Sequence, residues 1–157
     1  MGDPKKQRKK YETPLRPWDK KIIQEEAEIL RKYGLRRKRE IYRAESILRN
    51  FRRQARRLAA EMNEDEKKKL IGKLNRLGFV EKNATLDDIL SLTLEDVLNR
   101  RLQTIVFKKS LANTIKQARQ FIVHGHVKVG DRKIRWPSFI VPKELENEIS
   151  VEIGGKK

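Results

Sequence analysis

The segment from Leu94 to Glu152 combines regularly spaced apolar residues with a large excess of positive charge. Between Val97 and Trp136 the sequence contains ten lysines or arginines and a single acid, Asp131. Its apolar residues have the spacing of two short helices followed by a tight hairpin, so this segment can fold around a core. A folded surface with this charge is expected to bind an anionic polymer.

The composition limits the kind of anionic partner. The 157 residues suffice for one ordinary domain, or for a small domain with attached helices, and they have a formal net charge of +17. Such a charge predicts strong, salt-sensitive attraction to nucleic acid or to an anionic membrane. No stretch has the roughly 18 apolar residues of a membrane span, and the N-terminus lacks the apolar centre of a signal peptide. We therefore expect a soluble cytoplasmic protein, and the absence of cysteine excludes disulfides and thiolate metal sites.

The positive charge is concentrated in two blocks. Residues 1 to 60 have a net charge of +12 and residues 97 to 136 of +9, whereas residues 61 to 96 have −3. Two basic blocks separated by a nearly neutral spacer predict a protein that grips one polyanion at two places. Because the apolar content is only 37%, part of the chain is expected to fold against a partner.

The N-terminal half is predicted to be helical after a basic arm. Asp19 can cap a first helix that stops at Gly34, and a longer helix is expected from about Lys38 to Met62. One face of the longer helix is apolar, and arginines recur on the other at steps of three and four residues. These arginines are Arg39, Arg43, Arg49, Arg52, Arg53, Arg56 and Arg57. Such a face is either simply solvated or neutralised by phosphate, and the scarcity of acids favours phosphate.

Three pairs of capping residues predict further helix starts. They are Asn63 with Glu66, Thr85 with Asp88, and Thr93 with Asp96. The third pair predicts a helix near Leu94 to Gln103. Another helix is expected from about Ala112 to Val123, and Gly125 should end it.

Strand-like runs follow the last helix. Residues 126–129 and 132–134 flank Gly130 and Asp131, a two-residue connection that suits a type II′ hairpin turn. Residues 139–141 and 149–153 are expected to add strands. The predicted fold class is α+β: a mainly helical N-terminal region followed by a small module of two helices plus a small antiparallel sheet. The expected boundaries are 1–18 for the basic arm, 19–93 for the helical region, 94–153 for the module and 154–157 for a tail.

The sequence offers little for catalysis or metal binding. The glycines at 125 and 130 lack the Lys and Ser or Thr of a phosphate loop, and His124 and His126 lack further ligands nearby. The paired acids lie at helix starts, where capping explains them. We therefore expect no enzyme activity, no cofactor and no metal. The aromatics Trp18, Tyr33, Tyr42, Trp136 and Phe139 either pack in the core or stack on unpaired bases.

Two resemblances sharpen this interpretation. The run K-Q-A-R-Q-F-I-V-H-G-H-V-K-V at residues 116–129, followed by P-S-F-I-V, closely resembles the RNA-binding module named after small-subunit ribosomal protein S-four. The opening M-G-D-P-K-K-Q-R-K-K-Y-E-T-P, the run L-R-N-F-R-R-Q-A-R-R-L and the run L-N-R-R-L-Q-T-I-V-F-K-K-S-L-A are similar to the archaeal branch of that ribosomal protein family. The cysteines that bind zinc in some bacterial relatives are missing, so no metal is carried over.

The family resemblance implies a ribosomal protein of the small subunit, a primary binder of 16S-type ribosomal RNA at a multi-helix junction of the 5′ domain. It also implies roles in assembly of the subunit body and in translational accuracy, and contact with small-subunit protein S-five. By this resemblance the RNA-facing positions of the module are Arg100, Arg101, Lys108, Lys109, Lys116, Gln117, Arg119, Gln120, His124, His126 and Lys128. From charge alone we add Lys5, Lys6, Arg8, Lys9, Lys10, Arg49, Arg52, Arg53, Arg56, Arg57, Arg132, Lys133 and Arg135.

Three other classes of protein remain as alternatives. The first is a free-standing RNA chaperone of the heat-shock type that uses the same module. The second is an enzyme that uses the module to reach RNA, and the third is a DNA-binding helix-turn-helix protein.

Overall fold

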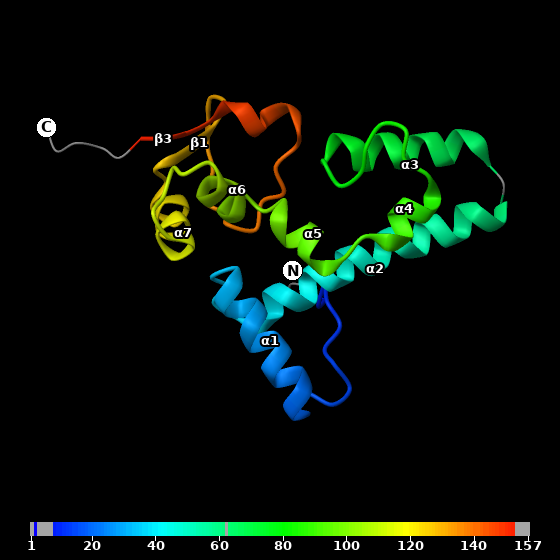
Figure 1. Cartoon of the computed structure of the whole chain (residues 1–157), viewed down its shortest axis with the longest axis horizontal. Helices are drawn as coiled ribbons and strands as arrows, with labels where there is room; N and C mark the ends of the chain where they lie inside the picture. The colour runs from blue at the N-terminus through cyan, green and yellow to red at the C-terminus, as the bar shows by residue number, and fades with distance from the viewer. Residues whose placement is uncertain (1, 3–7, 62, 153–157) are drawn as a thin grey trace, which may run out of the picture.

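Helices form most of this chain, and a small sheet lies near its C-terminal end (Figure 1). The computed structural model describes residues 2, 8–61 and 63–152. Within them the helices are α1 Lys20–Lys32, α2 Lys38–Glu61, α3 Glu64–Arg76, α4 Leu86–Ser91, α5 Leu94–Asn99, α6 Leu102–Lys108 and α7 Ile115–His124. The strands are β1 Val127–Val129, β2 Arg132–Lys133 and β3 Ile149–Val151, and a 3-10 helix, η1 Glu144–Glu148, precedes β3. The predicted α+β class is confirmed.

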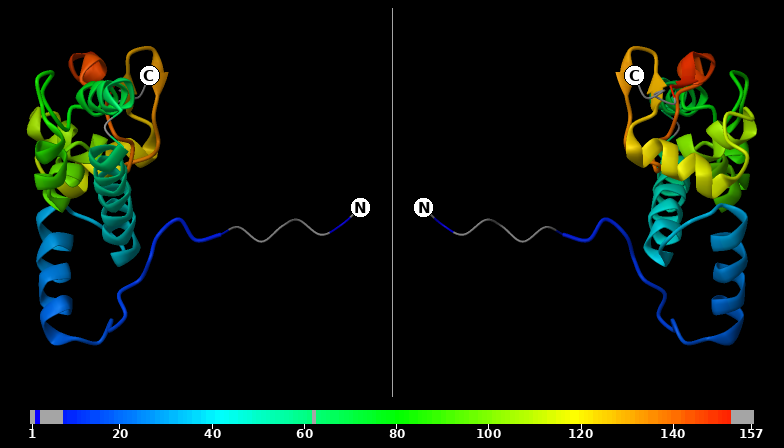
Figure 2. Two further views of the ribbon diagram at one scale, coloured as in Figure 1. Left: turned by 90° about the vertical axis from the view of Figure 1, so that its right-hand side faces the viewer. Right: turned by 90° about the vertical axis from the view of Figure 1, so that its left-hand side faces the viewer.

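The long helix α2 organises the first of two hydrophobic cores. Its apolar face buries Ile41, Leu48, Phe51, Ala55 and Leu58, and helices α1, α3, α4 and α5 pack against it. Helix α1 contacts α2. In both views of Figure 2, the remainder of α1 extends away from the body of the fold. Because these helices cover the apolar face of α2, most of its opposite, arginine-bearing face is exposed to solvent.

The helix boundaries follow the local capping signals. The Asp19 carboxylate accepts a hydrogen bond from the Lys21 backbone N–H at 3.0 Å, as a cap of α1 should. The Thr85–Asp88 pair forms a capping box at the start of α4, and in the Thr93–Asp96 pair the Asp96 carboxylate accepts from the Thr93 backbone N–H at 2.8 Å. These expectations are confirmed.

Gly34, which follows α1, combines a special backbone conformation with a close contact. Its φ is +57°, in the left-handed region. A Cβ atom at this position would lie 2.7 Å from Cγ2 of Ile115, at the start of α7. The glycine therefore ends α1 and also lets the end of this helix approach the start of α7.

The predicted single helix from Leu94 to Gln103 is wrong, because the chain breaks at Arg100 and Arg101 into α5 and α6. The backbone there bonds to residues 139–141 instead of continuing the helix. The Val141 N–H donates to the Arg100 carbonyl at 3.1 Å, the Leu102 N–H donates to the Phe139 carbonyl at 2.7 Å, and Arg101 forms a β-bridge with Ile140. Residues 139–141 consequently pair with this break and not with the sheet, which corrects their predicted role as a further strand.

The second core lies between α6, α7 and the sheet. Its buried residues include Leu102, Val106, Ile122, Val127 and Val141. The strands are antiparallel in the order β2-β1-β3, and Val129 pairs with Arg132 across the hairpin. Gly130 has a φ of +58° whereas φ of Asp131 is not positive, the pattern of the expected type II′ turn. Helix α7 begins at Ile115, later than predicted, because the Thr114 hydroxyl accepts from the Gln117 N–H and caps it there.

Candidate nucleic-acid interface

A groove runs along the solvent side of α2, where the two cores meet. It consists of three adjoining hollows that share Ile47, with volumes of about 400, 590 and 570 Å³. The first is bounded by α2, α7 and residues 137–140, and the second by α2 and residues 8–11 of the arm. We call these hollows together the cationic groove. Its lining cations are Arg8, Lys9, Lys10, Arg36, Arg37, Arg39, Arg43, Arg49, Arg53, Lys73, Arg101 and Arg119, and its lining acids are Glu12 and Glu40.

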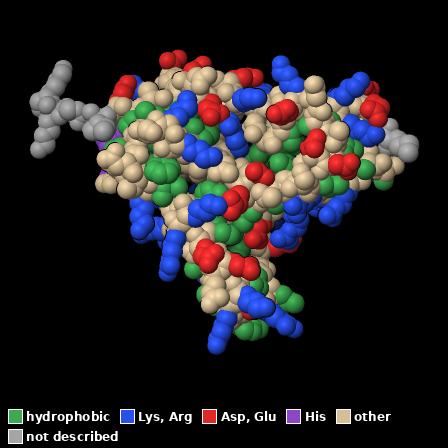
Figure 3. Space-filling model, in the orientation of Figure 1, with side chains coloured by type: hydrophobic (Ala, Val, Ile, Leu, Met, Phe, Trp, Pro, Cys, Tyr) green, Lys and Arg blue, Asp and Glu red, His purple; other side chains and the backbone are tan. Residues whose placement is uncertain are grey.

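Basic side chains also stand out on the molecular surface. Figure 3 shows lysine and arginine side chains gathered along the lower edge of the body, on both sides of the projecting helix α1. Such a concentration of like charge creates a potential that attracts phosphate and releases counterions from it.

The arginines of α2 differ in how available they are. Arg39, Arg43 and Arg56 are exposed, and within the described residues none of them has a carboxylate partner within 4.0 Å. Arg49 pairs with Glu12 of the arm, and Arg57 pairs with Glu66 of α3 at 3.2 Å. The unpaired arginines can bind phosphate without first breaking an ion pair.

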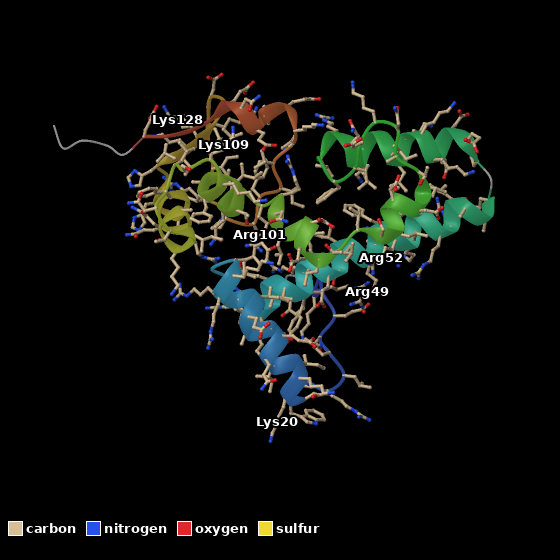
Figure 4. All side chains as sticks on the ribbon, viewed as in Figure 1. Lys20, Arg49, Arg52, Arg101, Lys109 and Lys128 are labelled. Atoms are coloured by element: carbon tan, nitrogen blue, oxygen red, sulfur yellow. The ribbon has the colours of Figure 1, made fainter. Side chains whose placement is uncertain are left out.

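Arg52 does not belong to this exposed face. Its side chain is half-buried and donates to the Leu92 backbone carbonyl at 2.5 Å, which ties α2 to the segment between α4 and α5 (Figure 4). The structure thus gives the Arg52 guanidinium a contact within the fold, and its contact with RNA stays a prediction.

Residues 11 and 12 of the basic arm lie against α2. The rings of Tyr11 and Tyr42 are stacked with centroids 6.3 Å apart, and the Arg43 guanidinium lies 5.9 Å from the Tyr11 centroid. This contact places the exposed residues Arg8, Lys9 and Lys10 along the groove. The predicted contacts Lys5 and Lys6 lie outside the described residues.

At the floor of the groove, one carboxylate joins the two cores. Glu40 of α2 accepts from Arg101 at 2.6 Å through Oε2, and Arg119 of α7 donates to both of its oxygens, at 3.0 Å to Oε1 and 3.1 Å to Oε2. Arg119 also donates to the Gln103 side-chain oxygen at 3.2 Å, and the Gln103 amide donates to the Gly34 carbonyl at 3.1 Å. We call Glu40, Arg101, Arg119 and Gln103 the junction cluster.

The electrostatics of the junction cluster favour the ionised carboxylate. Burial alone would raise the pKa of Glu40, but the hydrogen bonds from Arg119 and Arg101 outweigh it and lower the pKa to about 2. Burial lowers the pKa of Arg101, and its pairing with Glu40 opposes this effect. The cluster is thus a structural ion network in which each buried charge depends on the others.

Several cations predicted to face RNA have structural roles instead. Arg101 is only 5% exposed, and its head group lies where the two cores meet (Figure 4). Arg100 donates to the backbone carbonyls of Leu77 at 3.1 Å and Val141 at 2.7 Å, and pairs with Glu146 at 2.7 Å. The structure thus gives these two arginines contacts within the fold, and their contact with RNA stays a prediction.

Three more of the predicted positions are partly engaged within the protein. The Lys109 ammonium donates to the Glu146 backbone carbonyl, and Lys128 pairs with Glu152 at 2.5 Å. Arg119 keeps partial exposure, 24% of its side chain, at the wall of the groove although its guanidinium binds Glu40. These side chains contribute to the local positive potential, but their donors are already bound to other groups of the protein.

The remaining predicted positions of the module lie at the surface or close to it. Exposed ones are Lys108, Lys116, Gln120, His124, Arg132, Lys133 and Arg135. Gln117 and His126 are half-buried; the Gln117 oxygen accepts from the Asn113 N–H at 2.8 Å, and the His126 ring lies edge-on to Phe121. The Arg135 guanidinium packs over Gly125, which brings the end of the hairpin beside the end of α7.

The structure adds groove residues that the sequence analysis missed. Arg36, Arg37 and Lys73 line the groove but were not predicted as ligands. For Arg36 and Arg37, the run of four consecutive cations from Arg36 to Arg39 at the start of a helix could have predicted a phosphate-binding surface.

Other kinds of site find no support in the described part of the chain. Within residues 2, 8–61 and 63–152 no three His, Asp or Glu side chains are grouped so that they could hold a metal ion. None of the helices described there is long and apolar enough to cross a membrane. The cationic groove and the exposed basic side chains of the module, on the other hand, are the features of a nucleic-acid-binding class of protein.

Comparison with known proteins identifies the family. Residues 100–147 match the S4 domain family. The chain is 55% identical over 156 residues to small ribosomal subunit protein uS4 of Picrophilus torridus, which covers 96% of this chain and 85% of the relative. It is 56% identical over 153 residues to uS4 of Saccharolobus solfataricus, and this alignment covers 95% of this chain and 84% of the relative. It is 54% identical over 154 residues to uS4 of Methanococcus aeolicus, and this alignment covers 96% of this chain and 87% of the relative. The chain belongs to the uS4 family of small ribosomal subunit proteins.

Proposed function

We propose that this protein is a structural, non-enzymatic constituent of the small ribosomal subunit that binds ribosomal RNA in the cationic groove and on the exposed face of its S4 domain. The observation that carries the proposal is the groove itself, in which unpaired arginines of α2 face the wall formed by the S4 domain. Phosphate contacts of this kind hold a protein in register on folded RNA, whereas shape and 2′-hydroxyls distinguish RNA from DNA.

The arrangement of the two cores favours a folded RNA over a single duplex. The groove follows α2, and the exposed cations of α7 and the hairpin belong to the S4 domain on the other side of the junction cluster. Several RNA helices that meet at a junction would contact both surfaces together. The family resemblance implies a multi-helix junction in the 5′ domain of 16S-type RNA, and we propose that this junction is the ligand and that binding there promotes assembly of the subunit body.

Two finer parts of the proposal concern the ribosome as a whole. The family resemblance implies that the protein contacts small-subunit protein S-five and contributes to translational accuracy, in the cytoplasm where ribosomes work. A free-standing RNA chaperone is less favoured, because the similarity to uS4 proteins extends over nearly the entire chain and not over the S4 domain alone.

A salt titration of RNA binding tests the groove. Binding of the protein to a 5′-domain RNA fragment should weaken with salt by a log-log slope of about −0.7 to −0.9 per neutralised phosphate. The double change Arg39→Gln and Arg43→Gln should weaken binding and reduce the slope by about one to two.

The matched control is the double change Lys68→Gln and Lys82→Gln, which removes the same charge from exposed residues that do not line the groove. Filter binding near 0.15 M salt, where the Debye length is about 8 Å, separates local contacts from long-range attraction. Equal losses of affinity in the two double variants would contradict binding in the groove.

A further inference from the structure

Trp136 exposes its ring beside the groove. Its relative exposure is 69%, although tryptophan is on average well buried in folded proteins. Within the described residues its ring makes none of the stacking or cation–π contacts recorded for Tyr11, Tyr33 and Phe121. An exposed ring of this kind has a free π-face, and its charged surroundings decide what could stack on it.

The backbone that carries this ring is held by hydrogen bonds of Trp136 and of the residues that follow it. The Trp136 carbonyl accepts from the Phe139 N–H at 3.1 Å, which closes a tight turn over residues 136–139. The turn is fastened to the start of α6, because the Leu102 N–H donates to the Phe139 carbonyl at 2.7 Å and the Gln103 N–H donates to the Pro137 carbonyl at 3.4 Å. The ring is thus presented on a fixed support, which reduces the entropy that a ligand must overcome on binding.

The surroundings of Trp136 are positively charged. Arg135 precedes it and is exposed, as are Arg132 and Lys133 of β2. Pro137 and Ser138, which follow it, line the first hollow of the groove together with Arg119. An RNA backbone in that hollow would therefore contact the two residues that directly follow Trp136 in the sequence.

We propose that Trp136 is a stacking site for an unpaired nucleobase, whose own phosphates are bound by the neighbouring cations. This inference rests on the proposed function, because the base must belong to an RNA that occupies the groove. A nucleobase fits the site better than an apolar side chain of another protein, since the flanking cations attract phosphate and a base offers a flat π-face. Stacking of this kind accepts any of the four bases, so the site selects an unpaired nucleotide and not a sequence.

The test compares three substitutions at an exposed position where the fold should tolerate them. Trp136→Phe keeps an aromatic face, Trp136→Leu keeps only apolar bulk, and Trp136→Ala removes both. Each variant is titrated with the 5′-domain RNA fragment at several salt concentrations, and its fold is verified by thermal unfolding. We expect the Leu and Ala variants to bind roughly five- to a hundredfold more weakly and the Phe variant to lose less, with the salt slope unchanged in all three because no phosphate contact is removed.

Fluorescence gives a second, direct measurement. The sequence has two tryptophans, so a Trp18→Phe variant leaves Trp136 as the sole indole. Its emission should be quenched when the RNA binds, as stacking on a base requires. Salt-dependent binding without quenching, and with equal affinity in the Ala variant, would overturn the stacking site while leaving the proposed function intact.

Two further outcomes also decide the question. Full affinity of the Leu variant together with weak binding by the Ala variant would mean apolar packing, and would overturn base stacking. Failure of the unmodified protein to bind the RNA would overturn the proposed function and this inference together.

Discussion

Replacing Glu40 by glutamine removes the carboxylate that Arg101 and Arg119 share, while keeping the size of the side chain. Arg101 is 5% exposed, so the variant leaves a buried guanidinium facing a neutral amide. Removing one partner of a buried ion pair is strongly destabilising because the remaining charge stays desolvated. We therefore expect the junction between the two cores to weaken in Glu40→Gln.

The magnitude of this loss follows from the pKa of Glu40. The side chain is 14% exposed, and its pKa falls from the ordinary 4.5 to about 2 in the folded protein. At about 1.4 kcal/mol for each pH unit, this difference corresponds to roughly 3 kcal/mol of stability at neutral pH. Since the folded-state pKa lies below the unfolded one, the contribution is fully present above about pH 4.5 and is lost as the pH falls towards 2.

Urea unfolding between pH 7 and pH 3 measures this contribution. The free energy of unfolding of Glu40→Gln should lie about 3 kcal/mol below that of the unmodified protein at pH 7, and the two should converge as the pH falls below 4.5. Glu45→Gln on the same helix is the matched control, because burial and the nearby Glu26 raise the pKa of Glu45, so its removal should not destabilise at pH 7. A loss below about 1 kcal/mol at pH 7, or a constant difference between the curves, would refute the reasoning.

Two further substitutions test the packing between the cores. Gly34→Ala should destabilise the protein by at least about 1–2 kcal/mol in thermal unfolding, because φ of Gly34 is +57° and the new methyl would lie 2.7 Å from Ile115. Gly72→Ala is the control, because nothing lies within 4 Å of the new methyl. This variant should be neutral or stabilise α3 by up to about 1 kcal/mol. Equal effects would contradict the close approach at Gly34. Arg119→Ala should lower the free energy of unfolding by about 1–3 kcal/mol in addition to weakening RNA binding, because its guanidinium holds Glu40 and Gln103. Unchanged stability in urea unfolding would contradict this structural role.

Local signals in the sequence predicted most element boundaries well. Asp19, Thr85 and Thr93 cap helices where expected, and Gly130 makes the expected turn, because each of these interactions joins residues at most a few positions apart. The interruption between α5 and α6 had no such signal. It is caused by hydrogen bonds between residues 100–102 and 139–141, which only the folded chain brings together.

The candidate site was less predictable than the fold. The periodicity of α2 predicted which face is apolar and which carries arginines, and the exposed Arg39, Arg43 and Arg56 agree with it. Periodicity did not identify Arg52, which lies at the edge of that face and bonds to Leu92, 40 residues away. The family resemblance likewise placed Arg100 on the RNA-facing surface, whereas its side chain holds Leu77 and Val141 in place.

By itself the sequence determined the two basic blocks, the capping residues and the type of the hairpin turn, because charge is a property of composition and caps depend on near neighbours. Only the tertiary structure decided which cations remain free to bind a ligand. Arg43 and Arg101 are the same kind of residue in equally basic surroundings, yet one is exposed without a carboxylate partner and the other is buried against Glu40, 61 residues distant in sequence. Such pairing depends on where distant segments meet, and only the packing of the second core against α2 and the first core brings Arg101 to Glu40.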